Sequence, residues 1–209
     1  MTSKSPVRRS SLFVTLALAT AVTALTSACA PLLIGGAAVS GALMYTDRRT
    51  SGAQLEDQAI EFKAGPRLKE ALGERAHLNV TSYNRLALIT GEVASEADRA
   101  AAEKAIASID NVRSTVNEVA VMGLSSLTAR SNDALLTSKV KASFIDDGNI
   151  QANAIKVVTE RSVVYLLGRV TEKEATKAAE IARGVSGVQK VVRVFEIISD
   201  AELKAIEAK

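Results

Sequence analysis

The stretch LNVTSYNRLALITGEV at residues 78–93 decides the fold, because the stretch IKVVTERSVVYLLGRV at residues 155–170 repeats its pattern. Three pairs of identical residues stand 77 positions apart: Val80 and Val157, Gly91 and Gly168, and Val93 and Val170. Flanking positions on both sides match at 76 positions, so the copies differ by one residue in their loops. Because self-similarity at a fixed spacing is typical of a repeated unit, the sequence predicts two copies of one small domain.

Both copies predict the same order of elements: helix, strand, strand, helix, strand. The β-rich runs lie at 78–82, 86–91, 155–159 and 163–168, with hairpin-sized joins at 83–85 and 160–162. Ser95 and Thr171 each precede an acidic residue by three positions, which predicts capped helix starts. These helices should end near Asn111 and 184–187, and last strands follow at 112–121 and 188–198. We therefore expect an α+β fold of two tandem αββαβ domains, each a three-stranded mixed sheet packed against two helices.

The first helix of each copy is less regular. In the second copy, Asn132 and Asp133 precede an amphipathic pattern and predict a helix that begins with a cap. The apolar stripe of this helix consists of Leu136, Val140 and Phe144. In the first copy, Gly65 and Pro66 interrupt the apolar pattern of residues 55–72, so we expect a helix that is broken or starts late.

The N-terminal residues predict export and lipid attachment. Residues 1–9 are basic, residues 12–25 are apolar but too short to span a bilayer, and small residues precede Cys29. Ser27-Ala28-Cys29 resembles a bacterial lipobox, in which the cysteine receives acyl chains such as palmitate and becomes the mature N-terminus. The alternative is ordinary cleavage after Ala30, which would discard the cysteine and release a soluble protein.

The boundaries that follow from these patterns divide the chain into six parts. They are a signal peptide at 1–28, a lipidated tether at 29–54, a first domain at 55–121, a linker at 122–131, a second domain at 132–198 and a tail at 199–209. Ser199 and Glu202 predict a short capped helix in the tail.

Charge and cysteine content exclude several classes of protein. The chain has 26 basic and 23 acidic side chains, but Lys4, Arg8 and Arg9 of the leader account for the excess. The remainder is neutral, so we expect no nucleic-acid partner. Cys29 is the only cysteine and His77 the only histidine, which excludes an internal disulfide and a cysteine zinc cluster. We expect no cofactor and no metal.

The arrangement resembles the BON domain. The resemblance rests on a glycine near the end of the second strand, in ITGEV and LLGRV, and on the turn before the last strand, in VSGVQKV and IDNVRST. Over residues 29–198 the chain is similar to dual-BON-domain outer-membrane lipoproteins of Gram-negative bacteria, associated with division and outer-membrane integrity. Asn111 departs from the family pattern, because it replaces the turn glycine.

This resemblance implies a location and a function. It implies a protein anchored to the outer membrane and facing the periplasm, and Ala30 after the cysteine favours the outer over the inner membrane. It also implies binding of anionic phospholipid through the second domain, support of outer-membrane integrity, and no enzymatic activity. An alternative is an adaptor that docks other envelope proteins.

Local charge agrees with a lipid-binding second domain. Residues 55–121 carry 8 basic and 11 acidic side chains, whereas residues 130–199 carry 11 basic and 8 acidic side chains. In the first helix of the second domain, Leu135 lies about 100° from the apolar stripe, with Lys139 four residues on along the same flank. We expect Leu135 and Lys139, with Lys141 as a weaker candidate, to contact phospholipid.

Other candidate residues have structural explanations. His77 aligns with Ala154 of the other copy, so we expect it at a strand edge and not in catalysis. Gly91 and Gly168 lie outside any glycine-rich run, and we expect them where a side chain would clash. No serine has the setting of a nucleophile, and no paired carboxylates fall in a predicted cleft.

Overall fold

The structure is a computed structural model that describes residues 47–73 and 75–208, all within one compact unit. The predicted signal peptide, the predicted acylation site Cys29 and the tether up to residue 46 lie outside the described residues. Within 47–73 and 75–208, no helix combines the length and the apolar character that a membrane crossing requires.

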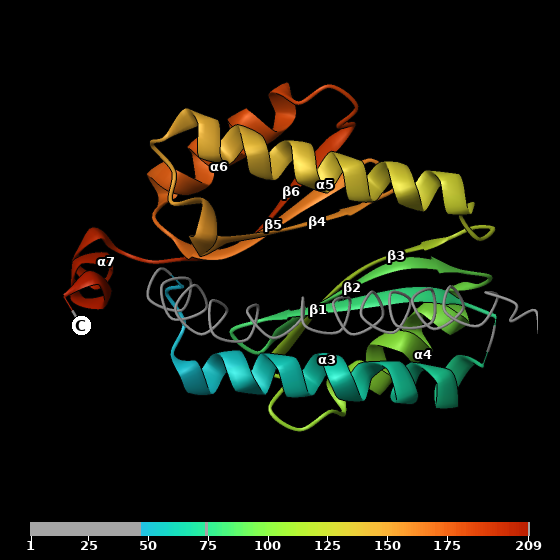
Figure 1. The fold of residues 1–209 in the computed structure, drawn as a ribbon. Helices are drawn as coiled ribbons and strands as arrows, with labels where there is room; N and C mark the ends of the chain where they lie inside the picture. The colour runs from blue at the N-terminus through green and yellow to red at the C-terminus, as the bar shows by residue number, and fades with distance from the viewer. Residues whose placement is uncertain (1–46, 74, 209) are drawn as a thin grey trace, which may run out of the picture. The chain divides into compact units, whose positions relative to one another are not determined.

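The first domain begins with a long helix, and its elements follow the predicted order. They are α3 (Ser51–Leu72), β1 (His77–Tyr83), β2 (Leu86–Val93), α4 (Glu96–Ala107) and β3 (Ser114–Val121). Strand β2 is central, antiparallel to β1 and parallel to β3. Both helices lie on the same face of the sheet (Figure 1), where they enclose an aliphatic core that includes Ile60, Ile89 and Ile106.

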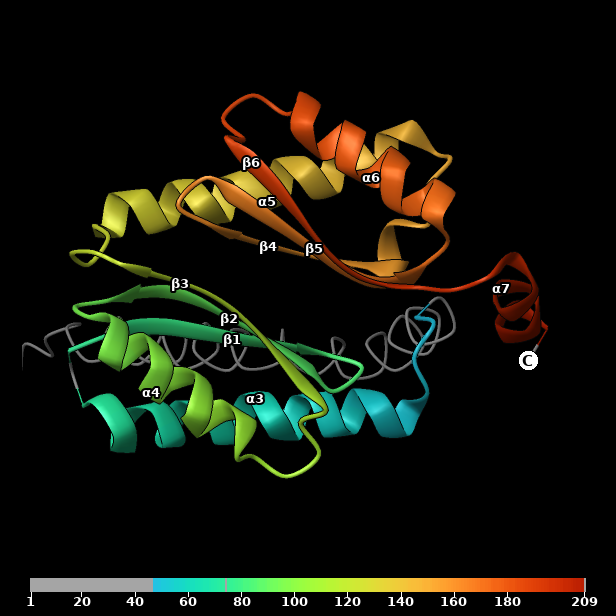
Figure 2. The ribbon, with the colours of Figure 1, turned by 180° about the vertical axis from the view of Figure 1, so that it is seen from behind.

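The second domain repeats this arrangement. Its elements are α5 (Leu127–Asp147), a short 3₁₀ turn η2 (Ala152–Ala154), β4 (Ile155–Glu160), β5 (Val163–Val170), α6 (Glu172–Gly184) and β6 (Lys190–Ile197). The sheet order β4-β5-β6 and the mixed pairing match those of the first sheet. Helices α5 and α6 cover one face of the sheet, as Figure 2 shows from behind. The α+β fold of two tandem αββαβ domains is confirmed.

Helix caps follow the sequence signals. Thr171 caps α6 through a reciprocal pair with Glu174, and Ser199 caps the C-terminal helix α7 (Asp200–Glu207) in the same way with Glu202. Asn111 has a φ of 69°, in the left-handed region that Gly187 also adopts in the other copy. Asparagine tolerates this conformation better than other residues, which explains how it replaces the expected glycine.

Both hairpin turns are held by a buried aspartate of the neighbouring helix. The central turn residues, Asn84 and Arg85 in one domain and Arg161 and Ser162 in the other, all have positive φ, as type I′ turns require. In the second domain the Asp133 carboxylate accepts the backbone N–H groups of Arg161 and Ser162 at 2.7 and 2.8 Å. Asp57 does the same for Asn84 and Arg85 in the first domain.

Two expectations about the first helices are wrong. Helix α3 is continuous through Pro66, because Pro66 and its neighbour Gly65 are on the exposed side, where water can satisfy the carbonyl that proline leaves free. Helix α5 begins at Leu127 with Ser126 as its cap, so the end of the expected linker is helical. Asp133 lies inside this helix and binds the turn instead of capping.

The sheet faces opposite the helices pack against each other. Tyr83 and Leu88 of the first domain form one buried cluster with Tyr165 and Leu167 of the second. Burial raises the pKa of both tyrosines to about 12. Because β2 packs on α3 and α4 on one side and on the second sheet on the other, all its residues but Leu86 are buried. We call this contact between the two sheets the seam.

Both repeat glycines lie inside strands at close backbone contacts. A Cβ on Gly91, which has a φ of 115°, would overlap the carbonyl oxygen of His77 on the adjacent strand. A Cβ on Gly168 would stand 2.6 Å from the carbonyl oxygen of Ala154. Any side chain at these two positions would therefore push the first strand of the sheet away from the second.

Candidate functional site

Helix α5 presents its outward face to solvent, and the three residues expected to contact lipid lie on it. Leu135 is 55% exposed, and Lys139 and Lys141 are exposed as well. At 100° per residue, Leu135 points away from the buried stripe, and the two lysines flank the outward face on opposite sides. The structure therefore places all three on one solvent-facing surface of the helix, although Leu135 and Lys141 do not adjoin.

Two apolar residues that the sequence analysis missed extend this surface. Leu127 is 78% exposed and Ile145 is 68% exposed, and their separation of 18 residues puts them on the same side of α5. Between them the outward side carries small residues: Ser131, Ser138 and Ala142, all exposed. We call Leu127, Leu135 and Ile145 with Lys139 and Lys141 the α5 face. Recognising it requires the true start of the helix, because Leu127 was assigned to the linker.

The α5 face has no exposed carboxylate between its ends. The only acidic residue from 127 to 145 is Asp133, which is 6% exposed and bound to the hairpin turn. At the C-terminal end of the helix, Asp147 lies 3.1 Å from Lys177, and this hydrogen bond lowers the pKa of the carboxyl group. The surface is therefore apolar and cationic along nearly the whole helix.

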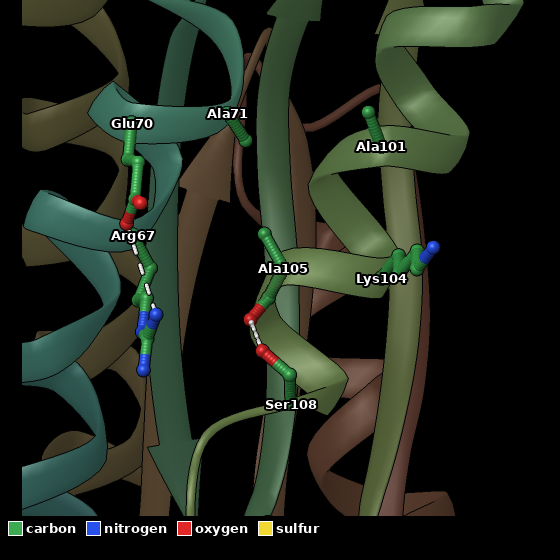
Figure 3. A pocket seen from close by; sticks show the side chains of 7 residues that line it. All are labelled: Arg67, Glu70, Ala71, Ala101, Lys104, Ala105 and Ser108. Carbon is green, nitrogen blue, oxygen red and sulfur yellow. Dashed lines mark hydrogen bonds and ion pairs between the residues drawn. The ribbon is translucent and has the colours of Figure 1, made fainter.

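The first domain offers a different surface on its two helices. Figure 3 shows a shallow groove of about 380 Å³ between α3 and α4, where Arg67 and Glu70 of α3 face Ala105 and Ser108 at the end of α4. A neighbouring groove of about 350 Å³ includes Phe62, which is 83% exposed. Both grooves are open and lack a buried polar group, so they suit a protein contact better than a small ligand.

A cluster of ionisable side chains at the edge of the seam escaped the sequence analysis. His77 and Glu92 oppose each other in the β1–β2 pairing, as the sequence register could have indicated. Glu160 of the second domain joins them, so that one potential ligand atom from each residue lies within 4.8 Å of the others. Burial raises the pKa of Glu160. His77 does lie at the start of an edge strand, as expected.

The residues just before α3 contact both domains. Arg48 is 4% exposed and binds the carboxylate of Glu174 in the second domain at 2.6 and 2.8 Å. Its neighbour Arg49 binds Asp57 at 2.7 Å and lies over the ring of Tyr83 in the first domain. This segment therefore joins the two domains at a point that sequence spacing could not predict.

The comparisons with known proteins agree with this architecture. The BON domain family matches residues 56–123 and 132–199, one match for each structural copy. The chain is 35% identical over 185 residues to Outer membrane lipoprotein DolP of Haemophilus influenzae, an alignment that covers 88% of this chain and 95% of the relative.

Two further relatives share parts of the chain. The 21 kDa hemolysin of Actinobacillus pleuropneumoniae is 30% identical over 154 residues, which cover 73% of this chain and 79% of the relative. Osmotically-inducible protein Y of Escherichia coli is 41% identical over 61 residues, which cover 29% of this chain and 30% of the relative. The long alignments span both copies, so the similarity extends to the two-domain arrangement.

Proposed function

Since this chain belongs to the BON-domain family and is an outer-membrane lipoprotein with two copies of the domain, we propose that its second domain binds anionic phospholipid through the α5 face and thereby supports outer-membrane integrity. Its location at the outer membrane, facing the periplasm, follows from the similarity to the Haemophilus lipoprotein. Attachment through Cys29 and a non-catalytic role are part of the proposal. The observation that carries it is the exposed apolar and cationic surface of α5 without an exposed carboxylate.

The physical case rests on the chemistry of the α5 face. Leu127, Leu135 and Ile145 are apolar side chains that gain up to about 1.5–3 kcal/mol each when they are fully buried. Each well-placed lysine gains about 1 kcal/mol near an anionic surface. Partial insertion therefore supplies several kcal/mol, which is a weak interaction by itself. An acyl anchor on the same chain would raise the effective concentration of lipid enough to make it persist.

The test is co-sedimentation of residues 46–209, the compact unit without the anchor, with lipid vesicles. We expect binding to vesicles that contain phosphatidylglycerol, little binding to phosphatidylcholine vesicles, and weaker binding at high salt. Leu135→Glu should reduce the affinity at least tenfold, because it removes an apolar contact and adds a repelled charge. Lys139→Glu combined with Lys141→Glu should act in the same direction and reduce the salt dependence.

The matched control is Leu55→Glu, which changes an equally apolar side chain, 69% exposed, on α3 of the first domain. It should leave vesicle binding unchanged, and circular dichroism should be the same for both variants. Equal binding to neutral and anionic vesicles, or equal losses for Leu55→Glu and Leu135→Glu, would contradict the proposal.

A second candidate function is that of an adaptor for envelope proteins, and the exposed Phe62 favours it. A phenylalanine that is 83% exposed beside two grooves is an uncommon surface feature and is typical of a protein contact. Phe62→Ser should abolish recovery of a partner from solubilised envelope in pull-down experiments, whereas Leu135→Glu should preserve it. The reverse pattern would favour lipid binding alone.

A further inference from the structure

The cluster at the edge of the seam has the composition of a metal site. His77 begins β1, Glu92 lies opposite it on β2, and Glu160 ends β4 of the other domain. Glu92 is 0% exposed and Glu160 is 4% exposed. Two neighbouring carboxylates in a buried setting are destabilising unless cationic groups or a metal ion accompany them.

One carboxylate oxygen of the cluster lacks a hydrogen-bond donor. Oε2 of Glu92 lies 3.3 Å from Nδ1 of His77 and accepts from the hydroxyl of Ser125 at 3.2 Å. Oε1 of the same carboxylate accepts no hydrogen bond, although the side chain is fully buried. Nε of Arg161 stands 3.8 Å away, which balances charge but exceeds hydrogen-bond length. A buried acceptor without a donor is uncommon and is well suited to bind a cation.

We propose that His77, Glu92 and Glu160 bind a divalent transition metal ion of the zinc class, which links the two domains. Donor atoms on a tetrahedral zinc ion stand about 3.4 Å apart, and the 3.3 Å between His77 and Glu92 already matches this spacing. Glu160, within 4.8 Å, reaches the same point by a small rotation of its side chain. An imidazole with two carboxylates suits zinc better than calcium, which requires six or more oxygen ligands.

The surroundings of the cluster fit a bound ion. Nδ2 of Asn79 donates to Oε2 of Glu160 at 3.0 Å, and with Ser125 it orients the two carboxylates as outer ligands do in metal sites. A solvent-open cavity of about 230 Å³ borders His77 and Glu160, which provides an entry path and room for a water ligand. Arg130 also lines this cavity, so an entering cation competes with two guanidinium groups, those of Arg130 and Arg161.

The other copy of the repeat shows that the fold itself does not require these three residues. The positions 77 residues away carry different chemistry: Ala154 in place of His77, Arg169 in place of Glu92, and Tyr83 in place of Glu160. Both copies nevertheless form the same strands and the same hairpin turn. The cluster is therefore a feature of one end of the seam alone, as a site for a ligand would be.

The test uses the full chain in detergent and titrates it with zinc sulfate in a calorimeter at neutral pH. We expect saturable binding of one zinc ion per chain and a higher temperature of thermal unfolding with zinc. His77→Ala and Glu160→Gln should each weaken zinc binding roughly 10- to 100-fold and remove the thermal shift. Glu180→Gln, which changes an exposed carboxylate on α6, is the matched control and should change neither.

Three results would overturn the proposal. They are no saturable zinc binding by the wild-type chain, equal binding by His77→Ala and the control, and calcium binding as tight as zinc binding. Glu92→Gln should behave like the other two ligand variants. If its buried position prevents folding, His77→Ala and Glu160→Gln decide the question, since His77 lies at the edge of the sheet and Glu160 next to the turn.

Discussion

Nη2 of Arg48 lies 2.6 Å from Oε1 of Glu174, so a residue that precedes the first domain is ion-paired with the first turn of α6 in the second. Nη1 of the same guanidinium donates to the carbonyl oxygen of Arg169 at 3.0 Å. The side chain of Arg48 is 3% exposed and that of Glu174 is 20% exposed. A charge-assisted pair with this burial stabilises the native state more than a surface ion pair does.

Replacing Arg48 with Met should lower the free energy of unfolding by about 2 kcal/mol, because Glu174 loses its charged donor in a partly buried setting. Urea unfolding measures this change. Arg67→Met is the control, because Arg67 and Glu70 form an exposed pair at 3.7 Å, and it should change stability by less than about 0.5 kcal/mol. Equal effects of the two substitutions would show that the Arg48 pair is no stronger than a surface pair.

The same pair predicts a pH dependence. Burial acts to raise the pKa of Glu174, but hydrogen bonds from Arg48 and Thr171 outweigh it, and the pKa lies below its model-peptide value of 4.5. The unfolded chain therefore binds a proton at higher pH than the folded chain does. The stability from this group is present above the unfolded-state pKa and is lost as the pH falls through the lowered folded-state pKa.

Glu174→Gln removes this contribution. Its urea midpoint should be below that of the wild-type chain at neutral pH, and the two midpoints should converge towards about pH 3. A constant difference between the two curves at every pH would contradict the lowered pKa.

Asp133→Asn should lower the free energy of unfolding by about 2 kcal/mol, because an amide group would face one of the two buried N–H groups of the hairpin turn. Thermal unfolding measures the effect. Asp110→Asn changes a carboxylate whose side chain is 85% exposed and should have almost no effect. Unchanged stability in Asp133→Asn would mean that the turn forms without its helix contact.

Two glycine substitutions should have opposite effects. Gly91→Ala should destabilise the protein by more than about 2 kcal/mol, because its Cβ would overlap a backbone atom and its φ is positive. Gly65→Ala should stabilise it by about 0.5–1 kcal/mol, since Gly65 lies in helix α3 with no atom near the position of a Cβ. Differential scanning calorimetry of both variants tests the prediction, which is wrong if Gly91→Ala unfolds at the wild-type temperature.

Local patterns in the sequence were sufficient to predict the fold. The repeated spacing of Gly91 and Gly168, the alternation in the strands and the capping pairs at Thr171 and Ser199 each depend on residues close in sequence. Such signals determine the order of elements and the pairing of strands. The start of α5 was missed, because Ser126 as a cap is as ordinary in a polar linker as in a helix.

The seam and its cluster could not be predicted in the same way. The nearly continuous burial of β2 indicates that both faces of its sheet are covered, but not what covers the second face. Glu160 follows Glu92 by 68 residues and meets it only after the two domains pack. Likewise, the pairing of Arg48 with Glu174 depends on tertiary structure alone.

The packing of Leu88 against Tyr165 has a consequence for the ancestry of the molecule. A polypeptide with only one repeat would turn an oily sheet toward solvent and would pair with its own kind through that sheet. Joining two such units in one gene replaces a concentration-dependent encounter with a permanent neighbour. Once the halves are fused, mutations at one end of their contact no longer have to suit both partners, which frees that end to acquire chemistry of its own.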